Sequence, residues 1–162
     1  MLGLNHTKNR LREVWSGRVG DHIIALEWNR DGRLLATAES TGPVTIFDGR
    51  TGAQEVRMIG HANGTLAIGW SPTSDLLATS GKDRLARLWD SAGRETASLE
   101  AATAWVEHLV WHPDGAILAA VAGKTIHLWD GQGQHLLDLA DHPSTVSDLA
   151  WKPNSTTLSA LV

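Results

Sequence analysis

The residues of this chain that could do chemistry are its histidines and carboxylates, because it has eight His and 18 Asp and Glu but no Cys. His61 and Asp83 are the first pair to consider, since a histidine can act as a general base while a carboxylate orients its ring. A buried pair that satisfies its own hydrogen bonds would have a structural role instead. The lack of cysteine excludes thiolate catalysis, disulfides and cysteine-based zinc sites.

Two other histidines, His108 and His112, flank Trp111 with a spacing of four. On a helix this spacing would bring two metal ligands to one face. The surrounding residues instead predict a strand followed by a turn, so we interpret both as surface residues. Gly81 and Lys82 lack the rest of a phosphate-binding loop. The sequence therefore predicts no catalytic residue, no metal ligand and no cofactor.

Tryptophan is unusually frequent, with eight Trp beside one Phe and no Tyr. Four of them recur every 40 to 42 residues, each just before a turn-forming segment: Trp28, Trp70, Trp111 and Trp151. A second series, of an aromatic residue followed by Asp, has the same period: Phe47-Asp48, Trp89-Asp90 and Trp129-Asp130. The chain is therefore built from repeats of about 40 residues.

Within a repeat the apolar pattern has the period of a strand, not of a helix. Four short runs are separated by Gly, Asn, Asp and Ser, which favour tight turns. Apolar residues two and five positions before the repeated Trp predict a bulge within the first strand. The Asp after each third strand is expected to accept hydrogen bonds from turn backbone. The sequence predicts an all-β fold.

The period, the Gly-His pair at Gly60 and His61, and the Trp-Asp pair at Trp89 and Asp90 together resemble the WD-repeat β-propeller family. The resemblance covers about residues 10–162. It implies four-stranded antiparallel blades, which form an incomplete ring in this chain. It also implies a hydrogen-bonded tetrad within a blade, at His61, Thr79, Asp83 and Trp89.

The repeats divide the chain into a series of predicted segments. These are an N-terminal extension (1–9), the outer strand of a closing blade (10–16), blade 1 (19–59), blade 2 (60–100), blade 3 (101–140) and the first two strands of blade 4 (141–162). Only blade 2 has all four tetrad residues, since blade 1 has Val19 at the His position and blade 3 has Gly123 at the Asp position. We expect the other blades to rely on apolar packing.

About three and a half blades cannot close a ring by themselves, because propellers have ~4 to 8 blades. Two explanations stay open: the chain is a piece of a longer propeller, or copies of it assemble into one ring. Either would leave apolar blade faces available for burial. We expect self-association of the polypeptide when it is alone.

Charge and hydropathy limit the classes of partner. The formal net charge is −4 and the chain has no basic run, so a nucleic-acid partner is not expected. No apolar run approaches the ~18 residues needed to span a bilayer, and the first residues lack the apolar core of a secretory signal. We expect no membrane association and a cytoplasmic location.

A candidate partner-binding rim follows from the resemblance. In the WD-repeat family, loops that enter a blade and turns between its second and third strands line one rim, where partners commonly bind. Trp105 lies in the loop entering blade 3 and either binds a partner or covers the blade edge. Lys82 and Arg84 lie in such a turn of blade 2. Both places belong to the same rim.

The predicted function is a non-catalytic scaffold that binds a protein or peptide partner through these rim loops. The alternative is an enzyme or a small-ligand-binding propeller with its site in the central channel, since fold alone does not decide function. Histidines and carboxylates converging in the channel would favour the enzyme, whereas an apolar rim patch around Trp105 would favour the scaffold.

Overall fold

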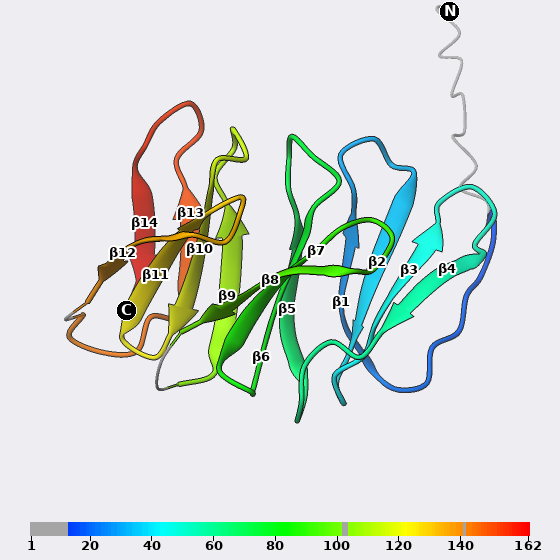
Figure 1. Ribbon diagram of the computed structural model, residues 1–162, viewed down its shortest axis with the longest axis horizontal. Helices are drawn as coiled ribbons and strands as arrows, with labels where there is room; N and C mark the ends of the chain where they lie inside the picture. The colour runs from blue at the N-terminus through cyan, green and yellow to red at the C-terminus, as the bar shows by residue number, and fades with distance from the viewer. Residues whose placement is uncertain (1–12, 102–103, 141) are drawn as a thin grey trace, which may run out of the picture.

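Four antiparallel sheets follow one another along the chain (Figure 1). They lie within residues 13–101, 104–140 and 142–162, the part of the chain that this computed structural model describes. Three sheets have four strands and the last has two, each hydrogen-bonded in sequence order. The predicted all-β fold of four-stranded blades in an open array is confirmed.

The strand bounds repeat with the period of the sequence. Blade 1 contains β1 (Ile23–Trp28), β2 (Leu34–Glu39), β3 (Val44–Asp48) and β4 (Gln54–Met58). Blade 2 contains β5 (Thr65–Trp70), β6 (Leu77–Gly81), β7 (Leu85–Trp89) and β8 (Glu95–Glu100). Blade 3 contains β9 (Val106–Trp111), β10 (Ile117–Ala122), β11 (Thr125–Asp130) and β12 (His135–Leu139). Blade 4 contains β13 (Asp148–Trp151) and β14 (Leu158–Leu161).

The first strands of neighbouring blades lie next to one another: β1 contacts β5, β5 contacts β9, and β9 contacts β13. An apolar core fills the space between each pair of adjacent blades. Between blades 2 and 3, for example, Leu88 and Leu99 pack with Leu118 and Trp129. Blades 2 and 3 therefore bury both faces of their sheets, which explains why their second strands are continuously apolar.

The periodic tryptophans join each blade to the one before it. The indole Nε1 of Trp70, Trp111 and Trp151 donates a hydrogen bond to a carbonyl in the first strand of the preceding blade. The acceptors are Glu27 at 3.2 Å, Gly69 at 3.0 Å and Val110 at 3.3 Å respectively. Trp28 has the same position in blade 1, where no described blade precedes it, and is 49% exposed.

Two local predictions are confirmed. The pairing of the first and second strands shifts by one residue in blades 1, 2 and 3, which is the expected bulge. Asp48, Asp90 and Asp130 each accept hydrogen bonds from backbone N–H groups of the turn that follows. Both features depend on short segments, in which sequence and conformation are closely coupled.

The segment before blade 1 differs from the prediction of an outer strand. Residues 13–16 form no strand, and residues 1–12 lie outside the described part of the chain. Blade 4 has two strands among the described residues. Trp15 instead stacks on Phe47 and donates to the carbonyl of Gly49 at 2.8 Å.

Exposed apolar side chains remain at the two ends of the array, including Leu26 and Trp28 of blade 1 and Leu161 of blade 4. Self-association through these faces stays a prediction. In the described part of the chain, no helix is long and apolar enough to cross a membrane.

Candidate functional site

The candidate rim begins at the turn between β6 and β7. Lys82 donates its backbone N–H to Gly64 at 3.0 Å, and Arg84 accepts one from Ala101 at 3.2 Å. Arg84 has a φ of 69°, the left-handed conformation that completes a tight turn. Neighbouring segments form backbone hydrogen bonds with both sides of this turn. The backbone that carries the Lys82 and Arg84 side chains is therefore held in place.

Trp105 lies just before β9 and meets this turn. Its side chain is 52% exposed, and the Lys82 Nζ lies 5.2 Å from the centroid of its ring. A cation over an indole face is favourable by about 0.5–1 kcal/mol at an exposed site. The structure therefore brings Trp105, Lys82 and Arg84 together, although they come from different blades.

A surface cavity of about 570 Å³ lies among these side chains. Its lining residues are Lys82, Arg84, Ala104, Trp105, Glu107, Gly123 and Thr145. Among the described residues, Lys82 and Arg84 form no salt bridge within 4.0 Å. The lining thus holds an aromatic surface, two cations that no carboxylate pairs with directly, and the Glu107 carboxylate. The aromatic surface and the cations suit an apolar group attached to an anion.

The four predicted tetrad residues form one chain of hydrogen bonds behind the rim. His61 lies with Nε2 2.7 Å from the Thr79 Oγ1 and Nδ1 2.8 Å from the Asp83 Oδ1. Trp89 donates its Nε1–H to the Thr79 Oγ1 at 2.8 Å. Arg87, which the sequence prediction did not include, donates to the Asp83 Oδ2 at 2.7 Å.

One protonation state satisfies the hydrogen bonds that link Trp89, Thr79, His61 and Asp83. Trp89 can only donate, so the Thr79 hydroxyl accepts from it and donates its own proton to the Nε2 of His61. The Nδ1 of His61 then carries the ring proton and donates to the Asp83 Oδ1, while the Arg87 Nη1, which lies 2.7 Å from the same nitrogen, donates to the Asp83 Oδ2. A neutral His61 and an ionised Asp83 follow.

The pKa values of the pair agree with this assignment. Burial lowers the pKa of His61, and the nearby Arg87 charge lowers it further, against the opposing effect of Asp83. Burial by itself would raise the pKa of Asp83, but hydrogen bonds from Arg87 and His61 outweigh it and lower the value. His61 is fully buried with both nitrogens engaged, so its geometry suits a structural role better than contact with a substrate.

A pH dependence of stability follows from the lowered pKa of His61. The unfolded chain takes up a proton on this residue below about pH 6.5 while the folded chain does not, so its contribution is present above that pH and is lost as the pH falls. We expect the difference in unfolding free energy between the wild type and His61→Gln to narrow from about pH 7.5 to about pH 5.5. Urea titrations at each pH measure it.

The pH dependence of the wild type alone would not isolate His61, because His112 changes the stability with pH in the opposite direction. The Ser155 carbonyl and the Asp114 carboxylate raise the pKa of His112, so its contribution is present at low pH and is lost as the pH rises through the folded-state value. His112 is common to both proteins and cancels in the difference. A difference that stays constant with pH would contradict a neutral, buried His61.

Two family models match parts of this chain. The model of the WD domain, G-beta repeat, matches residues 53–90 and 93–130, and the anaphase-promoting complex subunit 4 WD40 domain model matches residues 5–70. The chain belongs to the WD-repeat β-propeller family. The hydrogen-bonded set in blade 2 contains the four residues that the resemblance to this family implied.

Several WD-repeat proteins are similar to it over part of their length. WD repeat-containing protein 1 of Rattus norvegicus is 35% identical over 78 residues, which cover 44% of this chain and 13% of that protein. Protein HIR1 of Cryptococcus neoformans is 31% identical over 111 residues, which cover 64% of this chain and 12% of that protein. This WD-repeat chain thus spans about an eighth of the length of these relatives.

A solved structure shows the same arrangement of blades. A chain in the crystal structure of the mitotic checkpoint complex matches with a TM-score of 0.76 and 26% sequence identity. The match covers 85% of this chain and 45% of that chain.

Polar networks are not confined to blade 2 of this WD-repeat chain, contrary to the prediction that the other blades rely on apolar packing. In blade 1, Glu39 is fully buried and receives a hydrogen bond of 2.9 Å from Arg57. Strand pairing gives Glu39 the position that Gly81 has in blade 2. A Cβ at Gly81 would overlap His61, whereas blade 1 has Val19 at the His position and accommodates the glutamate.

The prediction that His112 is a surface residue is also wrong. His112 is only 8% exposed and packs edge-on against the ring of Trp151, with 4.7 Å between ring centroids. Its Nε2 donates to the Ser155 carbonyl at 3.0 Å, and its Nδ1 lies 2.6 Å from the Asp114 carboxylate. It therefore joins blade 3 to the turn of blade 4, a contact that only the adjacency of the two blades creates.

Proposed function

We propose that this chain is a non-catalytic scaffold and that the rim around Trp105 binds an acidic peptide segment of a protein partner. WD-repeat proteins are generally scaffolds for protein interaction, and one structural neighbour is a chain of a multiprotein complex. The observation that carries the proposal is the half-exposed Trp105 beside Lys82 and Arg84 on one cavity.

The residue types of the rim define the chemistry of the partner. Half-exposed tryptophans are frequent anchors of interfaces, because they remove much apolar area from water at little cost in side-chain entropy. The two cations favour Asp, Glu or a phosphorylated residue next to the apolar group. A peptide segment with an apolar side chain flanked by acidic residues fits both the Trp105 ring and the two cations, Lys82 and Arg84.

An enzyme is the other class that the sequence left open. Its best candidates for a catalytic base and orienting carboxylate were His61 and Asp83. Both are engaged in the tetrad, and His61 is fully buried. This arrangement favours the scaffold.

A peptide selection tests the proposal and needs no identified partner. A displayed library of random peptides is selected against the wild type, and we expect the enriched sequences to combine an apolar residue with Asp or Glu. Fluorescence polarisation of a selected peptide should show that Trp105→Ala weakens binding by about 30-fold, as expected for an interface hot spot. Arg84→Glu should also weaken binding, and more strongly at low salt.

Trp28→Ala is the matched control, because Trp28 is another exposed tryptophan, on blade 1. It should leave peptide affinity unchanged. If the enriched peptides carry no acidic residue, or bind Trp105→Ala as tightly as wild type, this rim is not the site.

A further inference from the structure

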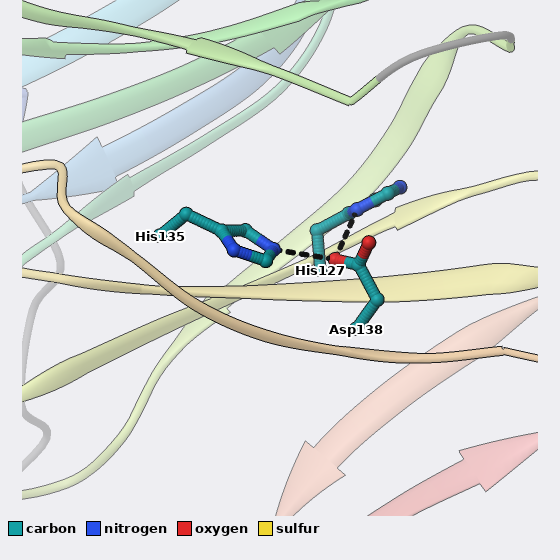
Figure 2. Close-up of side chains that lie close together, drawn as sticks. All are labelled: His127, His135 and Asp138. Atoms are coloured by element: carbon teal, nitrogen blue, oxygen red, sulfur yellow. Dashed lines mark hydrogen bonds and ion pairs between the residues drawn. The ribbon is translucent and has the colours of Figure 1, made fainter.

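Two histidines and one aspartate meet at the outer edge of blade 3. His127 lies on β11, and His135 and Asp138 lie on β12 (Figure 2). Trp129, on the same face of β11 as His127, packs in the core between blades 2 and 3. The three side chains therefore gather where the outer strands of blade 3 face blade 2.

The register between β11 and β12 explains why His127, His135 and Asp138 lie on the same face of the sheet. His127 is paired with Asp138, and a shift in the pairing after Leu128 places His135 opposite Trp129. His127 and Trp129 are two apart and point to the same side of β11. The extra residue in β12 changes its alternation, so His135 and Asp138 also share that side despite being three apart.

The three side chains present their donor atoms to a common point. The Nδ1 of His127 and the Nε2 of His135 each lie 2.7 Å from the Asp138 Oδ1. All three ligand atoms lie within 4.8 Å of one another. Bonds of about 2.0–2.2 Å to a tetrahedral zinc ion need donor atoms ~3.3 Å apart, which small side-chain rotations reach from here.

One of the three ligands is fixed and the other two can adjust. His127 is 6% exposed and stacks on Trp129, with 5.6 Å between ring centroids. The side chains of His135 and Asp138 are 51% and 44% exposed, so rotation costs them little packing.

The fold itself does not require this cluster. At the same register positions blade 1 has Thr45, Gln54 and Arg57. Blade 2 has Arg87, Glu95 and Ser98, of which Arg87 and Glu95 form a salt bridge. Both sets include an arginine, which repels a cation. Blade 3 alone among the three has three ligand residues there and no positive side chain at these positions.

We propose that His127, His135 and Asp138 bind one zinc ion. Two imidazole nitrogens and one carboxylate oxygen suit zinc or a similar transition metal, whereas calcium and magnesium prefer ligand sets made of oxygen alone. Three protein ligands leave a fourth position for water or for a group from a binding partner. The ion would tie the exposed strand β12 to β11.

Zinc chloride alone, added to the chelator-treated 162-residue chain, tests the site. Equilibrium dialysis should give one zinc ion per wild-type chain. His135→Asn and Asp138→Asn should each weaken binding by about tenfold or more. Cobalt(II) in place of zinc should show the visible absorption of a tetrahedral complex in the wild type, and that absorption should be lost in both variants.

His22→Asn is the matched control, since it removes one exposed histidine from a loop of blade 1. It should bind zinc as the wild type does. Zinc should raise the melting temperature of the wild type and the control but not of the two ligand variants. A wild type that binds no zinc, or ligand variants that bind it as tightly as the control, would show that the cluster is a hydrogen-bonded trio only.

Discussion

Trp111→Ala lowers the free energy of unfolding by about 3–5 kcal/mol, the usual cost of removing a buried tryptophan. Trp111 is 7% exposed in the core between blades 2 and 3, and its indole donates to the Gly69 carbonyl of blade 2 at 3.0 Å. The substitution therefore leaves a cavity and removes a hydrogen bond between blades. Denaturant titration followed by circular dichroism measures the change.

Trp28→Ala is the control that separates burial from residue type. Trp28 has the same position in its repeat, but it is 49% exposed and no described blade precedes it. We expect a loss below about 1 kcal/mol, as for a surface substitution. Equal losses at the two positions would mean that contact with the preceding blade is not what the periodic tryptophans provide.

The features that the sequence predicts well depend on local signals that recur in each repeat. The strand pattern, the bulge before each Trp and the turn that follows Asp90 are each encoded within a few residues. Each of these local signals occurs several times in the sequence, because the repeat itself occurs several times. The fold class could be inferred for this reason, and the resemblance to WD-repeat proteins then implied the tetrad positions.

The features that the sequence does not reveal depend on contacts across strands and blades. Glu39 looks like an ordinary surface residue until strand register places it at the position of Gly81. His135 and Asp138 are three apart, which on a regular strand puts them on opposite faces, and only the bulge brings them together. The positions of Glu39 and of the His135 and Asp138 pair become clear only when the repeats are aligned by strand register as well as by their tryptophans.

The rim is an intermediate case. The resemblance places Lys82 and Arg84 in one loop and Trp105 in another, but it does not say that they touch. Their contact needs blade 2 and blade 3 to be adjacent at a defined distance, which is set by the core between them. Whether Trp105 binds a partner or only covers the edge is a matter of binding energy, which the peptide measurement decides.

His61→Ala lowers the free energy of unfolding by about 1–3 kcal/mol, because it leaves buried hydrogen-bonding groups without partners. Thr79 loses the acceptor for its hydroxyl proton, and the Asp83 Oδ1 loses its donor at 2.8 Å and keeps only the Leu85 N–H at 3.3 Å. Arg87 still neutralises Asp83 at 2.7 Å, so the loss is smaller than that of an unpaired buried charge. Thermal and urea unfolding measure it, and an unchanged melting temperature would contradict the structural role.

A double-mutant cycle separates the network from the cavity that His61→Ala also leaves. Thr79→Val keeps the shape of its side chain but removes the hydroxyl that links His61 to Trp89. If the residues act as one chain of hydrogen bonds, the second substitution costs less once the first is made, with a coupling of about 0.5–3 kcal/mol. If His61 stabilises blade 2 only by filling space against Gly81, the two losses add. The same cycle with His22→Ala in place of His61→Ala should be additive, because His22 is exposed in blade 1.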